Sequence, residues 1–82
     1  MKYNYRRYDY KETLYRIKRW PTLLSRFPFV RIYSAEHQAY WRGTGQGYTL
    51  IPEESAIWEA EDAFDRTKHC GPEKKIEFIN AI

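Results

Sequence analysis

Cysteine is almost absent from this chain, which has only Cys70 among its 82 residues. One cysteine cannot form an intramolecular disulfide, and no signal-peptide pattern is present, so we expect a protein of a reducing cytosol. No apolar run approaches the roughly 18 residues that a membrane-spanning helix needs. These features argue against a disulfide-stabilised secreted scaffold and predict a soluble protein that does not enter the membrane.

Residues that serve catalysis and metal binding are also scarce. The two histidines, His37 and His69, form none of the CxxC or HxxxH spacings that hold zinc. His69 adjoins Cys70, but neighbouring residues of a helix point about 100° apart, and reactive cysteines favour helix N-termini or cationic pockets. We therefore predict that the protein is not an enzyme, has no catalytic residue, and uses no metal or cofactor.

Aromatic and charged residues are plentiful by contrast. Aromatic residues make up 18% of the chain, with eight tyrosines, and such rings serve equally in a small core and at a binding surface. The net charge of +3 hides an uneven distribution. Residues 1–33 carry nine basic and two acidic residues, a net +7, whereas residues 34–82 carry five and nine, a net −4. This distribution predicts a basic side and an acidic side.

Residues 1–28 predict a basic, tyrosine-rich arm followed by a helix. Asp9 and Glu12 have the spacing of a capping box at a helix N-terminus. Apolar residues then recur on one helical face between Tyr10 and Ile17, and Pro21 ends or kinks the helix. The residues before Asp9 form either an edge strand or a partly ordered arm.

Residues 29–82 predict a ββαβ core in the same domain. Three strands are expected: Phe29–Tyr33, Ala39–Arg42 and Ile76–Ile79. The first two should form a hairpin. A second helix begins either at Pro52 or near Glu59, and it ends before Gly71. The order α-β-β-α-β predicts a single α+β domain, in which a small antiparallel sheet packs with one or two helices.

A glycine-rich stretch, GTGQG, follows the hairpin at residues 43–47. Its backbone N–H groups suit an anion, but its spacing matches neither a P-loop nor GxGxxG. A flexible or bulged hairpin loop is one interpretation. The other is a small-ligand or nucleotide site formed by the loop and its neighbours: His37, Tyr40, Arg42, Gly45, Gly47 and Tyr48.

The clearest functional signal is the mixture of cations and tyrosine rings near the N-terminus. Nine residues carry it: Tyr3, Tyr5, Arg6, Arg7, Tyr8, Lys11, Arg16, Lys18 and Arg19. Arginine and lysine contact phosphates, and tyrosine stacks on bases. Tyrosine and arginine are also enriched at the energetic centres of protein interfaces. Three interpretations stay open: a surface for a protein partner, a surface for nucleic acid, or a solvated helix whose tyrosines cover the core.

Three motifs in residues 30–79 are distinctive: YSAEHQAYWR, GYT and TKHCGPEK. With them, this part of the chain resembles a family of short proteins from bacteriophages and prophages, whereas residues 1–28 do not match the pattern. No activity is assigned to that family, so the resemblance implies no catalytic residue. It implies a viral origin and action in the cytoplasm of a bacterial host. In the family, the equivalent of Ile57–Trp58 precedes the helix, which favours a helix start near Glu59.

Together these features predict a non-enzymatic phage accessory protein. We expect it to bind and modulate or inhibit a host machine, such as a bacterial defence complex, through its basic Tyr/Arg surface. The partner is then a host protein or ribonucleoprotein complex. Two alternatives remain, a nucleic-acid-binding module and a small-ligand or nucleotide binder at the glycine-rich loop.

Overall fold

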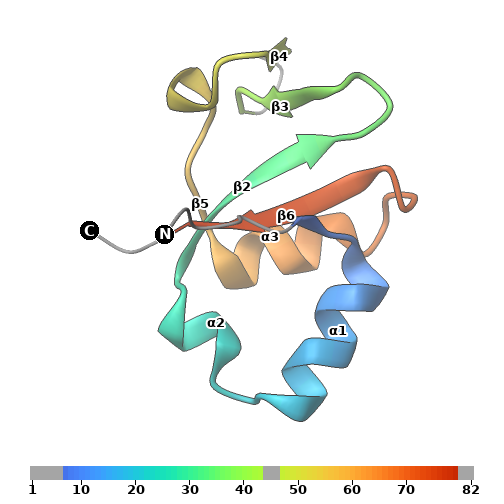
Figure 1. Ribbon diagram of the computed structural model, residues 1–82, viewed down its shortest axis with the longest axis vertical. Helices are drawn as coiled ribbons and strands as arrows, with labels where there is room; N and C mark the ends of the chain where they lie inside the picture. Colours follow the sequence, from blue (N-terminus) through green and yellow to red (C-terminus); the bar gives the residue numbers. More distant parts are fainter. Residues whose placement is uncertain (1–6, 44–46, 80–82) are drawn as a thin grey trace, which may run out of the picture.

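An antiparallel pair of strands, β2 and β6, lies at the middle of the fold (Figure 1). The computed structural model describes residues 7–43 and 47–79. In chain order its elements are β1 (Arg7–Tyr8), α1 (Tyr10–Arg19), α2 (Leu23–Arg26), β2 (Phe29–Ser34), β3 (Ala39–Trp41), β4 (Tyr48–Thr49), the 3-10 helix η1 (Pro52–Glu54), β5 (Trp58–Glu59), α3 (Ala60–Thr67) and β6 (Lys74–Phe78). The strand order β1-β6-β2-β3-β4, with β5 beside the first residues of β2, confirms the predicted α+β fold.

The core lies on the face of the sheet that the helices cover. Side chains alternate between the two faces of a strand, so Val30 and Ile32 point to the same side, and both are fully buried. Their partners on β6 are Phe78 and Ile76. Ala63 of α3 packs into the same cluster. The two predicted strands Phe29–Tyr33 and Ile76–Ile79 therefore supply the centre of the core.

Helix α1 begins at the predicted capping box. The backbone N–H of Glu12 donates to Asp9 Oδ1 at 2.8 Å, and the N–H of Asp9 donates to Glu12 Oε1 at 3.0 Å. Thr13 is fully buried, and its hydroxyl donates to the carbonyl of Asp9 at 2.8 Å. The helix ends at Arg19, two residues before Pro21, because the residue before a proline avoids the α conformation.

Three short strands, β1, β4 and β5, extend the sheet beyond the predicted core. β1 pairs with β6, so part of the N-terminal segment belongs to the sheet. Helix α3 begins at Ala60, which confirms the later of the two predicted starts, and Pro52 begins only a 3-10 turn. β6 begins at Lys74 rather than at Ile76, because its pairing with β2 continues as far as Ser34.

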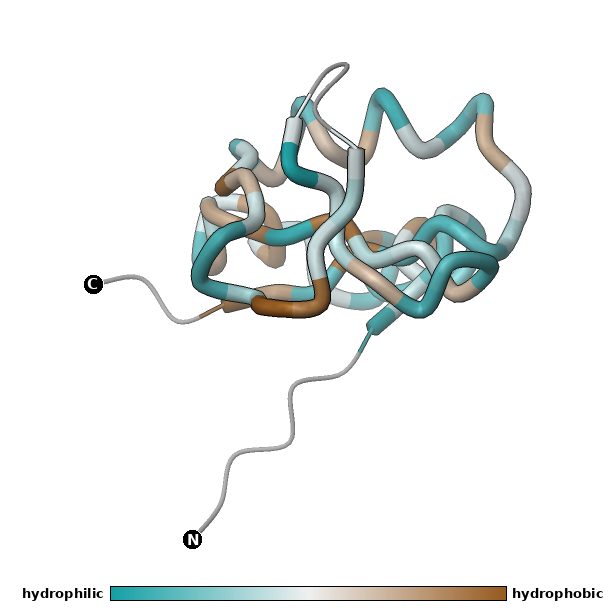
Figure 2. The backbone as a smooth tube through the Cα atoms, turned by 90° about the horizontal axis from the view of Figure 1, so that it is seen from above, coloured by the Kyte–Doolittle hydropathy of each residue, from teal (hydrophilic) through white to brown (hydrophobic). Residues whose placement is uncertain are grey.

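The segment between β4 and β5 crosses the end of the sheet and is held by a side chain of β2. Seen from above, the chain runs from β4 into a hydrophobic stretch at residues 50–51 (Figure 2). Leu50 is 77% exposed, so this stretch is not part of the core. Arg31 Nε donates to the carbonyl of Pro52 at 2.9 Å and to Ser55 Oγ at 3.1 Å. These bonds fasten the segment to β2.

Candidate partner-binding surface

The structure describes six of the nine predicted partner-binding residues, which lie on β1 and α1. Three of the nine lie outside the described residues: Tyr3, Tyr5 and Arg6. Arg7 and Tyr8 are successive residues of β1, so their side chains point to opposite faces of the sheet. The other four lie on α1: Lys11, Arg16, Lys18 and Arg19.

Arg7 belongs to a partly buried cluster on the face of the sheet opposite the core. Its Nε donates to Glu77 Oε1 at 2.8 Å, and its Nη2 donates to the hydroxyl of Tyr40 at 3.0 Å. That hydroxyl donates to the same carboxylate oxygen at 2.8 Å. The guanidinium also lies 3.9 Å from the centre of the Tyr33 ring. The charge of Arg7 is thus neutralised within the fold, and its side chain fastens β1 to the sheet.

The environment of the guanidinium of Arg7 favours its charged form. Burial alone lowers the pKa of Arg7, but its hydrogen bonds to Tyr40 and Glu77 outweigh this effect and raise the pKa above its ordinary value. These bonds give the guanidinium of Arg7 a role in the fold, and its side chain stays 40% exposed.

Three other arginines lie against aromatic rings on α1, α2 and their connection. The distance from guanidinium carbon to ring centre is 3.8 Å for Arg16 and Tyr8, 5.7 Å for Arg19 and Tyr15, and 5.6 Å for Arg26 and Trp20. Tyr15 is 56% exposed and Trp20 is 42% exposed. We call these six residues the α1–α2 surface. Helices α1 and α2 lie at the lower end of the molecule in Figure 1, and Tyr8 lies on β1 beside β6.

A row of rings anchors the α1–α2 surface in the core. Tyr8 lies 6.4 Å from Phe78, Phe78 lies 6.2 Å from Phe27, and Phe27 lies 5.9 Å from Trp20, all between ring centres. The row begins at Tyr8, passes through the buried ring of Phe78, and ends at the exposed indole of Trp20. Packed rings have few rotamers to lose, so they hold Arg16 and Arg26 in fixed positions at the two ends of the row.

The cations of α1 and α2 lack acidic partners. Within the described parts of the chain, five of them have no carboxylate oxygen within 4.0 Å: Lys11, Arg16, Lys18, Arg19 and Arg26. Arg66 and Lys68 on α3, by contrast, pair with Asp62 and Asp65. A basic surface that the fold does not neutralise attracts acidic partners and raises their association rate.

The residues predicted to form a ligand site at the glycine-rich loop are divided between the two faces of the sheet. His37 stacks on Tyr48, with 4.2 Å between ring centres and 29° between planes. Tyr48 pairs with Trp41 across β3 and β4 and shares its face, whereas the preceding residue, Tyr40, points to the opposite face. Tyr40 therefore joins the cluster of Arg7 and is separated from His37.

Only part of the loop lies within the described residues. Gly45 lies outside the described residues. Gly47 has a φ of 80°, a left-handed conformation that favours glycine. Its carbonyl accepts the N–H of Arg42 at 3.0 Å, which closes the loop. The side chain of Arg42 is exposed, and the described geometry is that of a hairpin loop with a glycine at its end.

The described ranges hold no group of three or more histidine, cysteine or acidic side chains placed to bind a metal. Cys70 is partly buried, and its Sγ lies 3.7 Å from the carbonyl of Arg66. His69 is exposed. No helix of the described chain is both long enough and apolar enough to cross a membrane.

Sequence reasoning missed half of the α1–α2 surface. Tyr15 and Arg19 are four residues apart, a spacing that places two side chains together on a helix, and this signal was available. Trp20 and Arg26 lie on either side of the turn between α1 and α2, and only the path of that turn brings them together. No family model, curated protein or solved structure matches the chain.

Proposed function

We propose that this protein is a non-catalytic binding protein whose α1–α2 surface docks on an acidic surface of a protein or ribonucleoprotein partner. The observation that carries the proposal is the set of three guanidinium–aromatic pairs, none with a carboxylate beside it among the described residues. Following the resemblance of residues 30–79 to short phage proteins, we place the partner in a bacterial host. Binding then modulates or inhibits a host machine, such as a defence complex.

The composition of the α1–α2 surface supports a protein partner. Tryptophan, tyrosine and arginine are the residues most enriched among those that dominate binding energy at protein interfaces. A guanidinium donates two parallel hydrogen bonds to one carboxylate. Rings that hold Arg16 and Arg26 in place reduce the conformational entropy that these side chains lose on binding.

Single-stranded nucleic acid is the alternative partner, since bases stack on aromatic rings and phosphates contact arginine. Such binding uses a series of ring faces that are open to solvent. Tyr8 does not offer one, because Arg16 lies over its ring and Phe78 packs beside it. Tyr15 and Trp20 remain exposed, and each already has a guanidinium within 6 Å of its ring. This arrangement favours a protein partner.

Affinity capture from a nuclease-treated lysate of the bacterial host tests the proposal. We expect the wild-type protein to retain a specific host protein, which is then purified for titration. Reversing the charge at two positions, Arg16→Glu and Arg19→Glu, should weaken its binding about 100-fold or more, because like charges then face each other. The matched control makes the same change in charge away from the surface, with Arg42→Glu and Lys75→Glu, and should bind within a few-fold of the wild type.

Two results would overturn the proposal. One is equal binding of the host protein by the wild type and by the Arg16→Glu/Arg19→Glu variant, since the surface then plays no part. The other is capture that disappears on nuclease treatment, together with binding of the purified protein to RNA or DNA that weakens steeply with salt. That outcome assigns the surface to nucleic acid instead.

A further inference from the structure

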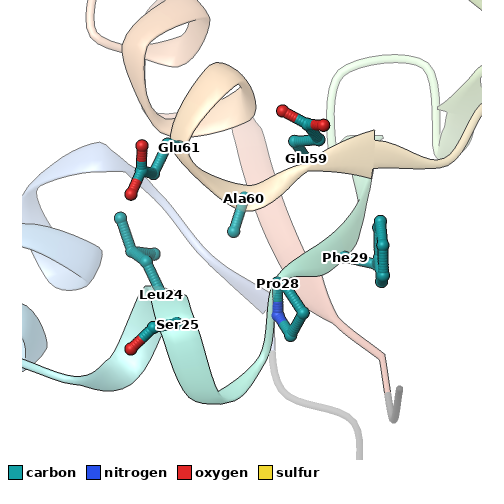
Figure 3. A pocket seen from close by; sticks show the side chains of 7 residues that line it. All are labelled: Leu24, Ser25, Pro28, Phe29, Glu59, Ala60 and Glu61. Carbon is teal, nitrogen blue, oxygen red and sulfur yellow. The ribbon is translucent and has the colours of Figure 1, made fainter. Parts of the chain in front are cut away.

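A hollow of about 390 Å³ lies where α2, the start of β2 and the start of α3 meet (Figure 3). Apolar groups and two carboxylates line it: Leu24, Ser25, Pro28, Phe29, Glu59, Ala60 and Glu61. Figure 3 shows the carboxylates of Glu59 and Glu61 on either side of Ala60, with Leu24 and Pro28 below them. The hollow thus combines an apolar floor with an acidic rim.

A backbone hydrogen bond fixes the position of the chain between Glu59 and Glu61. The N–H of Ala60 donates to the carbonyl of Pro28 at 2.7 Å, which joins the start of α3 to the start of β2. Both Glu59 and Glu61 are exposed. Within residues 7–43 and 47–79, neither has a cationic group within 4.0 Å. The preference of acidic residues for a helix N-terminus accounts for Glu59, the N-cap residue of α3, and for Glu61, but not for the apolar residues that line the hollow with them.

The shape and charge of the hollow suit a long aliphatic cation. Arginine and lysine bury their methylene groups on apolar surface while the charged head stays at the rim. Phe29, 42% exposed beside the hollow, adds a ring over which a guanidinium stacks well. The carboxylate of Glu59 or of Glu61 also offers a guanidinium the two oxygens with which it pairs through parallel hydrogen bonds.

The chain itself presents such cations next to the hollow. Helix α2 contributes to both features, because Leu24 and Ser25 line the hollow while Arg26 belongs to the α1–α2 surface. When a basic region and an acidic region lie side by side, two copies related by a two-fold axis complement each other. The basic region of each copy then meets the acidic region of the other.

We propose that the hollow is the docking site for the α1–α2 surface of a second copy, with Arg19 and Arg26 directed at Glu59 and Glu61 of that copy. The contact forms twice in the dimer. It uses the surface that the proposed function assigns to an acidic partner, so self-association and partner binding compete. It does not depend on the identity of that partner, and purified protein alone tests it.

Sedimentation velocity of the wild-type protein across a wide range of concentrations provides the first test. At low salt we expect the mean mass to rise from 10.0 kDa toward twice that value, and no further, because a two-fold contact closes at two copies. At about 1 M salt, where the Debye length falls to roughly 3 Å, the association should weaken at least tenfold.

Charge exchange provides the second test. The variant Arg19→Glu/Arg26→Glu and the variant Glu59→Arg/Glu61→Arg should each remain monomeric, because like charges then face each other in both contacts. An equimolar mixture should form a 1:1 dimer, since the exchange restores opposite charges. If the variant Glu59→Arg/Glu61→Arg fails to fold, the single variant Glu61→Arg replaces it. Glu61 is exposed on α3, and this single change should weaken the dimer at least tenfold. The matched controls, Arg42→Glu and Glu36→Arg, change exposed charges elsewhere and should dimerise like the wild type.

A wild-type protein that stays monomeric at all concentrations in low salt would refute the proposal. Dimers that survive either double charge reversal, or a mixture of the two variants that stays monomeric, would do the same. Association that continues beyond two copies would overturn the two-fold arrangement. None of these outcomes bears on capture of a host partner, so a failure here is distinguishable from a failure of the proposed function.

Discussion

Arg7 and Glu77 form an ion pair across β1 and β6, with 2.8 Å between Nε and Oε1, although 70 positions separate them in the chain. The two side chains differ in environment, because that of Glu77 is 7% exposed and that of Arg7 is 40% exposed. The hydroxyl of Tyr40 donates to the same carboxylate oxygen. A buried carboxylate with these two donors joins the first described strand to the last.

Replacing Arg7 with methionine should lower the free energy of unfolding by about 3 kcal/mol, because it leaves the carboxylate of Glu77 buried without its cation. The double variant Arg7→Met/Glu77→Met should recover most of that loss, since two apolar side chains replace a buried pair at little cost. Urea denaturation measures the free energy of unfolding of both variants. As a control, Arg66→Met breaks an exposed pair with Asp62 and should cost no more than about 1 kcal/mol. A double variant less stable than either single variant contradicts the prediction.

Tyr40 should make stability depend on pH in the alkaline range. Burial raises the pKa of its phenol, and the hydrogen bond to Glu77 adds to this effect against the lowering influence of Arg7. The folded protein therefore holds the phenolic proton more firmly than the unfolded chain, in which it leaves near pH 10. The resulting stabilisation is complete below about pH 10 and is lost as pH rises through the higher pKa of the folded state.

Urea denaturation from about pH 8 to about pH 11 measures this dependence. The variant Tyr40→Phe should be less stable at the lower end, because a hydrogen bond to a charged group is lost. Its stability should also fall less steeply above about pH 10. Tyr15→Phe, a change at an exposed ring, is the matched control and should follow the wild type. Parallel curves for wild type and Tyr40→Phe would show that the phenol does not contribute to the slope.

The capping box at Asp9 should contribute about 1 kcal/mol to stability. Asp9→Ala removes the acceptor for the N–H of Glu12 and leaves that donor without its side-chain partner. Thr22 precedes α2 and makes no capping hydrogen bond with its side chain, so Thr22→Ala is the control and should change stability by less than about 0.5 kcal/mol. Thermal unfolding monitored by circular dichroism compares the stability of the two variants with that of the wild type. Equal losses would mean that the box adds nothing beyond an ordinary surface residue.

Local signals explain why much of the fold was predictable. The capping box depends on two residues three positions apart, and the burial of Val30 and Ile32 follows from alternation along one strand. Both are properties of short segments. The pairing of β1 with β6 depends on residues 70 positions apart, and two-residue strands carry no periodicity. The sequence therefore showed the core strands and left the edges of the sheet unassigned.

The same distinction applies to the candidate surface. Sequence reasoning included Arg7 among the partner-binding residues because it adjoins Tyr8 in a basic, tyrosine-rich stretch. In the fold, successive residues of a strand point apart, so Arg7 pairs with the buried carboxylate of Glu77 while Tyr8 packs beneath Arg16. Arg26 lies outside the stretch that the sequence singled out, and the turn between α1 and α2 brings it to Trp20. The composition pointed to arginine and aromatic residues, and the path of the chain determines which of these residues lie next to each other.

Replacing the three arginines of the α1–α2 surface with lysine separates charge from stacking. The variant Arg16→Lys/Arg19→Lys/Arg26→Lys keeps its net charge. It loses the planar groups that lie within 6 Å of the ring centres and that can each donate two parallel hydrogen bonds to a carboxylate. We expect affinity for the captured host protein to fall at least tenfold, while the dependence of binding on salt stays the same. Isothermal titration at several salt concentrations measures both quantities.

The fold should tolerate these lysines, because all three guanidiniums lie at the surface and exposed substitutions usually change stability by less than about 0.5 kcal/mol. A thermal melt of the triple variant checks this. The partner could instead be a nucleic acid that is bound mainly through its phosphates. The triple variant should then bind it with an affinity within a few-fold of the wild type, and the salt dependence again stays the same. Affinity retained in the triple variant therefore contradicts docking by paired guanidiniums. A loss of affinity in the triple variant, whose net charge is unchanged, shows that the partner recognises the planar guanidinium groups and not charge alone.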